Sequence, residues 1–397
     1  MIKLVLYTEN YFPGGLERFI FDFADNSKFD IHIVVNSEND RIITFAKKRN
    51  IDYSAVKLSK IKLSFIKNSF LNNFIKLFNF IMYYFSIVPN YFKLKKVFSS
   101  LVEYENIMII NGGYPAALSS FSAVKASSKV GFKKVGLSIL SSPSSNYKNR
   151  IFRFFQHIID LYCDDLIDFY IPNSKKIKFE LISIVKINSK KIYVVYTGVD
   201  VDAIVNKKNE LNFANTTIKK ENYIWISMVA LIGSTKRQDI LVKALKKLDD
   251  NVKLIIAGDG PNRKKIENLV NNLSLNERVV FLGWIEDAMD VYLFSDINVF
   301  VSDQEGLPYV VSEAMSYKVP VIASNVGGIS EQIIENKGGL LLDKNDIDDL
   351  AKKINYLIFN TNQRDAFVDF SYERVKSEFS IKNMNDKLFK LYSEDDK

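Results

Sequence analysis

The chain has 397 residues, which is too long for one ordinary core. Of these residues, 47% are hydrophobic and 25% are charged, which is the composition of a globular protein. Its single cysteine, Cys163, excludes an intramolecular disulfide framework and fits a reducing compartment. The net charge of +8 is uneven, because residues 53–159 hold fifteen Lys and Arg against two acids. This excess predicts an anionic partner for the N-terminal half.

Short apolar runs alternate with helical spacing along the chain, which predicts repeated β-α units. In the first half, strands are expected at Ile2–Tyr7, Ile31–Val35, Ile107–Ile110, Lys134–Leu140, Phe169–Ile171 and Ile192–Val195. In the second half, they are expected at Tyr223–Val229, Val252–Ala257, Val279–Leu282, Ile297–Val301, Val319–Ala323 and Gly339–Leu342. The alternation predicts two α/β domains that are doubly wound and Rossmann-like, facing a central cleft. Their boundary is expected near residues 201–222, where apolar periodicity is weak.

Neither terminus nor interior predicts a membrane span. The start, residues 1–7, reads as a first strand and not as a secretory signal, because Glu9 follows so soon. The best interior window, 77–92, is uncharged but is interrupted by Pro89 and by two asparagines. A span needs about 20 mostly apolar residues. The sequence therefore predicts a protein that is not integral to a membrane.

Candidate ligand turns follow three of the predicted strands. Gly14 and Gly15 precede a helix, where they would let the backbone approach a ligand. The turn at 257–261 (A-G-D-G-P) lacks the third glycine of a dinucleotide fingerprint, so a ligand loop and a tight structural turn both stay open. Lys236 follows another strand, where an ammonium group could neutralise a leaving diphosphate. The alternative for Lys236 is an ordinary surface lysine.

The most informative stretch is 296–330, which reads as strand, loop, helix, strand and loop. Glu305 and Glu313, with seven residues between them, flank the start of the predicted helix. Loops at the carboxyl ends of parallel strands bind anionic ligands in open α/β sheets. Alone, the two acids would read as solvated surface charges, but the surrounding pattern favours a binding site.

The residues between the two acids fit a helix start that holds a phosphate group. Gly306 allows a close backbone approach. Pro308 suits the first turn of a helix, because it has no N–H to lose. The N–H groups of that turn would then point at a diphosphate. Glu313 could accept the hydroxyl hydrogens of a ribose.

Other catalytic chemistries find no support in the pattern. His32 lies in a strand pattern and His157 on an apolar helix, so both are expected to be structural. No His, Cys and Asp cluster has metal-ligand spacing, and no serine stands in a G-x-S-x-G elbow.

Together, these motifs resemble the retaining glycosyltransferases of the glycogen-synthase-like family 4 (glycosyltransferase group 1), which have the GT-B fold. The resemblance is strongest over residues 229–331. It rests on the motifs at 236–239, 257–261, 280–284, 305–315 and 320–328, with weaker matches at 14–15, 172–174 and 195–200.

The resemblance implies a hexosyltransferase that takes a nucleotide-sugar donor, such as a UDP- or GDP-sugar. Residues 1–200 would bind the acceptor and 201–379 the donor, with a C-terminal helix at about 380–397 packing back on the first domain. Glu305 and Lys236 would be catalytic, at the donor sugar and at the leaving diphosphate. The nucleobase would lie near residues 283–285. The other implied donor contacts are Gly15, Arg237, Gly306, Leu307, Pro308 and Glu313. No metal or other cofactor is expected, because the lysine and the helix termini supply the positive charge.

Two positions depart from the family pattern. Leu231 stands about five residues before Lys236, where the family commonly has an arginine, and Arg237 is the candidate replacement. Leu140 stands where the family commonly has a histidine. These departures leave a second interpretation open: a catalytically weak GT-B subunit that binds an acceptor or a partner.

A stripe of aromatic and aliphatic residues with flanking lysines runs through residues 61–98. It predicts a helix or hairpin in an anionic membrane interface, with a packed domain core as the alternative. Nucleic acid is not expected, because no recognised module is present. A glycan or lipid-linked acceptor is expected, and a lipid-linked one would account for both the charge and the apolar surface. We therefore expect a cytoplasmic enzyme, peripheral on the inner face of the cell membrane, that builds a bacterial surface glycan such as capsule or O-antigen. A basic membrane-binding scaffold is a third interpretation.

Overall fold

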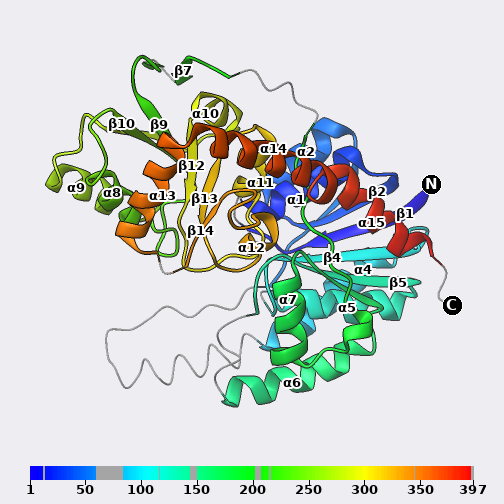
Figure 1. The fold of residues 1–397 in the computed structure, drawn as a ribbon. Helices are drawn as coiled ribbons and strands as arrows, with labels where there is room; N and C mark the ends of the chain where they lie inside the picture. The colour runs from blue at the N-terminus through cyan, green and yellow to red at the C-terminus, as the bar shows by residue number, and fades with distance from the viewer. Residues whose placement is uncertain are drawn as a thin grey trace. The chain divides into compact units, whose positions relative to one another are not determined.

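The computed structural model describes residues 1–11, 14–59, 84–115, 117–143, 150–201, 207–213, 216–343 and 345–394. The chain divides into two compact units, which are described separately (Figure 1). Unit 1 comprises Met1–Tyr196 and Met384–Lys397, and unit 2 comprises Thr197–Asn383. Each is an α/β domain built on a parallel sheet, as predicted.

Unit 1 has a six-stranded sheet with the order β3-β2-β1-β4-β5-β6. Strand β4 (N-I-M-I-I-N) is buried at every position, as expected where helices cover both faces of a parallel sheet. The elements of unit 1 in chain order are β1 (Ile2–Thr8), α1 (Gly15–Asn26), β2 (Phe29–Asn36), α2 (Asp40–Arg49), β3 (Asp52–Val56), α4 (Ile87–Phe98), β4 (Asn106–Asn111), α5 (Ser119–Val130), β5 (Lys134–Ile139), α6 (Arg150–Asp164), β6 (Phe169–Pro172), α7 (Lys175–Glu180), two short helices (Leu181–Val185 and Ser189–Lys191) and, from Met384 onward, α15 (Ile381–Ser393).

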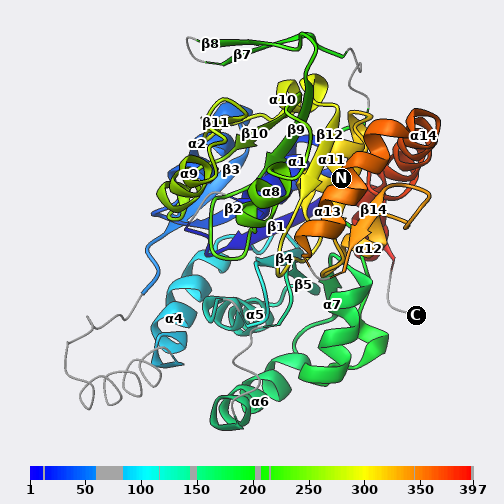
Figure 2. The same cartoon turned by 60° about the vertical axis from the view of Figure 1, so that its left-hand side comes forward.

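Helices α4, α5, α6 and α7 share one core with the sheet of unit 1 (Figure 2). The last helix, α15, also packs on this unit. The Tyr392 hydroxyl donates a hydrogen bond to the Ile107 carbonyl at 3.0 Å, and its ring meets the rings of Phe29 and Phe169 edge-on. The C-terminal helix thus completes the core of the first domain.

Unit 2 repeats the topology, with the strand order β11-β10-β9-β12-β13-β14. In both sheets the chain reverses its direction of winding beside the first strand, here between β9 and β12. Ligands of doubly wound sheets bind at the carboxyl ends of such a pair. The elements of unit 2 are β7 (Glu210–Phe213), β8 (Thr216–Lys219), β9 (Ile224–Val229), α8 (Gln238–Leu245), β10 (Val252–Ala257), α9 (Arg263–Asn272), β11 (Val279–Gly283), α10 (Met289–Phe294), β12 (Ile297–Phe300), α11 (Tyr309–Ser316), β13 (Val321–Ser324), α12 (Ile329–Gln332), β14 (Leu340–Leu342), α13 (Ile347–Phe359) and α14 (Thr361–Glu378).

The two faces of the unit 2 sheet have different covers. Ile226 and Leu254 belong to the core with α8, α9 and α13, whereas Trp225 and Ile255 belong to a core with α10 and the β7–β8 hairpin. Successive strand residues point to opposite faces, which explains this division.

One predicted strand is absent from the structure, and three observed strands were not predicted. The segment Ile192–Val195 forms no strand of its own, although Tyr193 and Val195 donate backbone hydrogen bonds to β6 at 2.9 and 3.1 Å. Strand β3 was not predicted, because D-Y-S-A-V lacks apolar alternation and only its last residue is buried. The β7–β8 hairpin falls in the stretch that was predicted as a boundary.

Within the described ranges, no helix is both long enough and apolar enough to cross a membrane. Most of the stripe predicted to lie in a membrane interface, residues 60–83, lies outside the described residues.

Candidate functional site

The loops that follow β9 and β12 lie side by side at the carboxyl edge of the unit 2 sheet, because the two strands pair in parallel. Hydrogen bonds join them. The Arg237 N–H donates to the Val301 carbonyl, and the Asp303 N–H donates to the Thr235 carbonyl, both at 2.9 Å. The Ser302 hydroxyl also donates to the Thr235 carbonyl, at 3.2 Å. This fixed pair of loops carries Lys236 and Glu305.

The Lys236 ammonium forms an ion pair with the Glu305 carboxylate across the two loops. The side chains are only 20% and 9% exposed, so the pair is largely shielded from water. The ammonium also lies 5.0 Å from the centre of the Phe300 ring. A cation and an acid are thus brought together at the point where a doubly wound sheet binds its ligand.

The second glycine loop supports Glu305 by direct backbone contact. Gly327 has a φ of +59°, and a Cβ atom there would lie 2.1 Å from the Glu305 carbonyl oxygen. The adjacent Gly328 N–H donates to the Gly306 carbonyl at 2.6 Å. The glycine pair after β13 therefore allows the Glu305 loop to sit where it does.

Helix α11 begins directly after this loop. Pro308 is its N-cap, one residue before the first-turn position predicted from the sequence. Leu307 is buried. The Gln332 side-chain amide donates a hydrogen bond to the Pro308 carbonyl at 3.0 Å, which anchors the start of α11. The N–H groups of a first helical turn have no partner within the helix and carry partial positive charge. This start can therefore receive an anion.

Glu313, on the second turn of α11, is partly buried. The fully buried Tyr292 donates its hydroxyl hydrogen to the Glu313 carboxylate at 3.1 Å, which fixes the direction of the acid.

Arg237 follows Lys236 in the chain, but its guanidinium forms ion pairs with carboxylates other than Glu305. Its guanidinium donates to Asp239 at 2.9 and 3.0 Å and to Asp303 at 3.2 Å. The hydrogen bond to Asp239 is the main cause that raises the pKa of Arg237, and the same bond lowers the pKa of Asp239. Leu231, at the position where the family commonly has an arginine, is 54% exposed.

The A-G-D-G-P turn supports the loop after β9. Gly258 has a φ of +135°, and a Cβ atom there would lie 2.0 Å from the Ala230 carbonyl oxygen. The Ile232 N–H donates to the Asp259 carbonyl at 2.9 Å. These contacts favour the structural interpretation of the turn. Trp284, in the segment predicted to meet a nucleobase, is half exposed after β11.

Two predicted positions belong to unit 1. Gly14 is the N-cap of α1 and Gly15 its first residue, and both are exposed. Leu140 follows β5, where its N–H donates to the Asn111 carbonyl at 3.1 Å and its carbonyl accepts from Asn173 at 3.0 Å. Leu140 therefore contributes backbone contacts between neighbouring strand ends.

Sequence reasoning missed a single carboxylate surrounded by hydroxyl groups at the carboxyl edge of the unit 1 sheet, after β1. Glu9 accepts hydrogen bonds from the hydroxyls of Ser119 and Tyr11, the latter at 3.0 Å. The buried Tyr7 donates to Ser119 at 2.7 Å, and burial is the main cause that raises the pKa of Tyr7. The position of Glu9 directly after the first predicted strand was the available signal.

In the part of the chain that the structure describes, no group of three or more His, Cys, Asp and Glu side chains is arranged to hold a metal ion.

Comparisons with known proteins place these features in context. The family model described as glycosyl transferases group 1 matches residues 208–374. An uncharacterized glycosyltransferase of Methanocaldococcus jannaschii is 32% identical over 284 residues, which is 66% of this chain and 78% of the relative. A Campylobacter jejuni enzyme is 27% identical over 271 residues, 67% of this chain and 70% of the relative. Its name is GalNAc-alpha-(1->4)-GalNAc-alpha-(1->3)-diNAcBac-PP-undecaprenol alpha-1,4-N-acetyl-D-galactosaminyltransferase.

Among solved structures, HepE of Anabaena in complex with UDP matches with a TM-score of 0.75 at 18% identity. The match covers 98% of this chain and 99% of HepE. This likeness confirms the predicted fold class of two Rossmann-like domains.

Proposed function

The chain belongs to the group 1 glycosyl transferases, and on that premise we propose that it moves a hexose from a nucleotide-sugar donor to an acceptor. The transfer retains the configuration of the sugar. The acceptor is a glycan or a lipid-linked molecule in bacterial surface polysaccharide biosynthesis. The ion pair of Lys236 and Glu305 beside the start of α11 is the observation that carries the proposal. The name of the Campylobacter relative, which includes a PP-undecaprenol glycan, supports a lipid-linked acceptor.

In this proposal the donor replaces the ion pair. Its diphosphate lies between the Lys236 ammonium and the first turn of α11, with backbone contacts from Gly306, Leu307 and Pro308. Glu305, released from the lysine, turns to the donor sugar. Glu313 holds the ribose, in the direction that Tyr292 sets. Arg237 keeps its two carboxylates, so Lys236 supplies the side-chain charge at the diphosphate.

The donor contacts outside unit 2's central loops follow from the family. The nucleobase lies near Trp284, and Gly15 is a further proposed donor contact. Lysine and helix termini carry the charge that a metal supplies in other transferases, so we propose that the reaction needs no metal.

The reaction breaks the bond between the sugar's anomeric carbon and the diphosphate oxygen, and forms a bond from that carbon to an acceptor oxygen. The sugar gains oxocarbenium character as the diphosphate gains charge. Fixed donors at the diphosphate therefore act mostly on the transition state. The leaving phosphate takes the proton of the acceptor hydroxyl on the same face, so no separate base is required.

A donor screen comes first in the test. Ligands that bind only the folded state raise the melting temperature, so the true donor should stand out among UDP-, GDP- and ADP-sugars. Lys236→Ala and Glu305→Ala should then each lower turnover by about 10²–10³-fold. Lys247→Ala is the matched control, because it removes a lysine from an exposed ion pair with Asp348 in the same unit. No nucleotide-sugar binding by the native protein would contradict the proposal.

We place the acceptor's hydroxyl groups near Glu9. A carboxylate with two hydroxyl neighbours at the carboxyl edge of a doubly wound sheet is suited to bind sugar hydroxyls. Glu9→Gln should raise the KM for the acceptor and leave hydrolysis of the donor by water unchanged. Equal losses in both reactions would remove Glu9 from the acceptor side.

We also propose that unit 1 contacts an anionic membrane. Exposed apolar side chains, each 50–63% accessible, lie on α6, on α4 and in the residues just before α4. In that preceding segment, the Tyr84 hydroxyl donates a hydrogen bond to the Gln156 side chain of α6 at 3.0 Å. Lys95, Lys96 and Lys129 are exposed on α4 and α5. The exposed apolar residues are Phe85, Val88, Phe92, Ile158, Leu161 and Tyr162. Aromatic and aliphatic groups beside lysines suit the interface of an anionic bilayer.

Flotation with vesicles tests the membrane contact. The native protein should float with phosphatidylglycerol vesicles, less so at high salt, and the double variant Phe92→Ser, Leu161→Ser should not. Phe359→Ser is the matched control, because Phe359 is 71% exposed in unit 2. Native protein that stays at the bottom of the gradient, or a double variant that floats as well as the native one, would contradict the claim.

The second candidate function is a catalytically weak subunit. The exposed Leu231 and the apolar Leu140 favour it, because the family commonly has an arginine and a histidine at these positions. Arg237, the candidate replacement for the arginine, is paired with Asp239 and Asp303. Nucleotide-sugar binding without turnover, with any acceptor glycan, would select this function over the first.

A further inference from the structure

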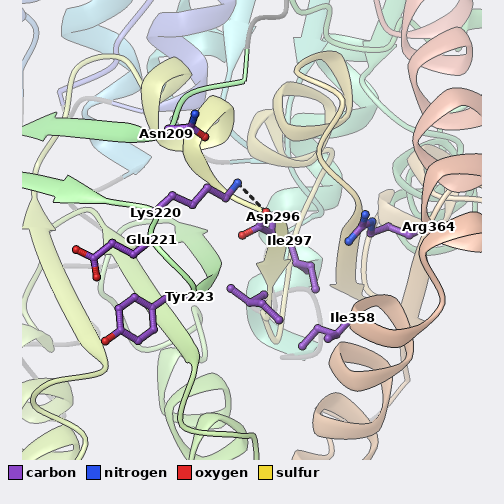
Figure 3. A pocket seen from close by; sticks show the side chains of 9 residues that line it. Asn209, Lys220, Glu221, Tyr223, Asp296, Ile297, Ile358 and Arg364 are labelled. Carbon is purple, nitrogen blue, oxygen red and sulfur yellow. Dashed lines mark ion pairs between the residues drawn. The ribbon is translucent and has the colours of Figure 1, made fainter.

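The two edges of the unit 2 sheet differ in how their polar side chains are connected. At the amino edge, a pocket of about 310 Å³ is lined by two cations and two acids, whose charges cancel: Lys220, Arg364, Asp296 and Glu221 (Figure 3). At the carboxyl edge, hydrogen bonds connect side chains that follow or end the strands β9, β12, β13 and β14. This second arrangement lies beside the proposed donor site and bears on how that site is held.

Asn345, in the loop after β14, is at the centre of the arrangement. Its amide nitrogen donates to the Ser302 carbonyl at 3.2 Å and to the Asp303 carboxylate at 2.9 Å. Its amide oxygen accepts from the hydroxyl of Ser324, the last residue of β13. The same Ser324 oxygen accepts from the Ser302 N–H at 3.0 Å. One side chain therefore joins the ends of β12, β13 and β14.

Asp303 extends this connection to the loop after β9. Its carboxylate also accepts from the Arg237 guanidinium, at 3.2 and 3.3 Å. Arg237 directly follows Lys236, and Asp303 lies two residues before Glu305. The chain of contacts from Asn345 through Asp303 to Arg237 therefore ends beside both members of the ion pair.

The residue type at position 345 fits this role. Asn345 has a φ of +52°, a left-handed conformation that asparagine adopts more readily than most residues. Glycine would fit the backbone as well, but glycine has no amide to form these hydrogen bonds. Ser302 and Ser324 are buried, so water cannot readily take the place of the amide at them. The side chain of Asn345, and not only its backbone, is therefore specified by its surroundings.

The connection matters most once the ion pair has opened. In the proposed function, the donor replaces the contact between Lys236 and Glu305, which removes one link between the two loops. The hydrogen bonds of Asn345 involve neither of these side chains, so they remain in place. We propose that Asn345 is a positioning residue, which keeps the start of the Glu305 loop fixed against the Lys236 loop while the donor is bound. This inference rests on the proposed function.

Asn345→Gly tests the inference, because it removes the amide and leaves a residue that suits the backbone. Turnover of UDP-glucose should fall by about tenfold or more, since a displacement of about 1 Å near the reacting groups costs about 100-fold. A GDP- or ADP-sugar replaces UDP-glucose if the donor screen selects one. The affinity for the nucleoside diphosphate should change little, because the contacts from Glu313 and the start of α11 are kept. The melting temperature should fall by only a few degrees.

Asp343→Ala is the matched control. The Asp343 carboxylate accepts a hydrogen bond from the Asn325 amide at 2.8 Å, so the variant removes a contact of the same kind between the loops after β13 and β14. The Asp343 side chain is exposed, and turnover should stay native. If Asn345 acts through Asp303, the double variant Asn345→Gly, Asp303→Ala should lose less turnover than the product of the two single losses.

Hydrogen exchange supplies a measurement that does not depend on turnover. With UDP bound, the amides of residues 302–306 should exchange faster in Asn345→Gly than in the native protein, and Asp343→Ala should leave them unchanged. Asp303 is exposed, so Asp303→Ala tests the same connection if Asn345→Gly fails to fold.

Three results would overturn the inference. Native turnover and native exchange in Asn345→Gly would remove Asn345 from the positioning of the site and leave the proposed function intact. An equal loss of turnover in Asp343→Ala would indicate general loosening of this edge. A native protein that binds no nucleotide sugar would refute the proposed function and this inference together, and the native protein alone reveals that result.

Discussion

Replacing Gly327 with alanine should damage both the stability of unit 2 and the donor site. The new methyl group would lie 2.1 Å from the Glu305 carbonyl oxygen, 2.7 Å from the Glu305 carbonyl carbon and 3.0 Å from the Gly306 oxygen. All three atoms are backbone, so no side chain can rotate to make room. The Glu305 loop must move instead.

The cost has two parts. An L-residue at a φ of +59° costs about 1–2 kcal/mol. Relieving the overlap requires the carbonyl to retreat by more than about 1 Å to reach an ordinary contact, and overpacking of this kind costs roughly 1–3 kcal/mol. The sum of about 2–5 kcal/mol lowers the melting temperature by roughly 4–20 °C for a domain of this size. A displacement of about 1 Å at Glu305 lowers turnover by about 100-fold.

Gly131→Ala is the matched control for the conformational part alone. Gly131 has a φ of +97° at the end of α5, and a Cβ atom there would meet nothing within 4 Å. We expect Gly131→Ala to lower the free energy of unfolding by about 1–2 kcal/mol and to leave the activity unchanged. Thermal unfolding and donor turnover of both variants give the comparison. If Gly327→Ala has the same melting temperature as Gly131→Ala and keeps native turnover, the backbone contact does not position Glu305.

Three further outcomes follow from single side chains. Burial raises the pKa of Cys163 to about 12, so iodoacetamide at pH 8 should leave this thiol unmodified in the native protein and should label it in urea. Mass spectrometry measures the labelling, and labelling of the native protein would contradict the burial of Cys163. Burial is also the main cause that raises the pKa of Glu17, so its ionised form costs stability once the pH exceeds its unfolded value. Glu17→Gln should therefore raise the melting temperature at pH 7 and give no such gain at pH 4 in scanning calorimetry, and an equal gain at both pH values would refute the assignment. Tyr392→Phe should lose about 1 kcal/mol in urea unfolding, because it removes the hydrogen bond to the Ile107 carbonyl; an unchanged midpoint would show that the bond contributes nothing net.

The sequence predicted both parallel sheets and most of their strands, because buried strands read as apolar runs. It missed β3 and the β7–β8 hairpin for a physical reason. The four-residue hairpin strands each bury one apolar residue, Leu211 and Ile218, which is too little to produce a recognisable alternation. Strand β3 is an edge strand with one buried residue, so its pairing with β2 is what forms it.

At the site, local patterns predicted the loops but not the contacts between them. Glu305 and Lys236 each stood out at a predicted strand end, yet their ion pair joins positions 69 residues apart. The commitment of Arg237 to Asp303 and the support of the Glu305 loop by Gly327 likewise depend on how strands β9, β12 and β13 align. The pocket at the amino edge of the unit 2 sheet brings Asp296 together with Arg364 of α14, and no local pattern contains both.

The division of unit 1 between the two ends of the chain also affects the order in which the protein can form on the ribosome. Tyr392 fills a site between Phe29 and Phe169, but it is made after all of unit 2. At synthesis rates of about 5–20 residues per second, the first sheet waits on the order of 10–40 s for its last helix. During that interval the rings of Phe29 and Phe169 lack their final cover. The nascent N-terminal domain is then exposed to chaperones and to aggregation until its last helix has been made.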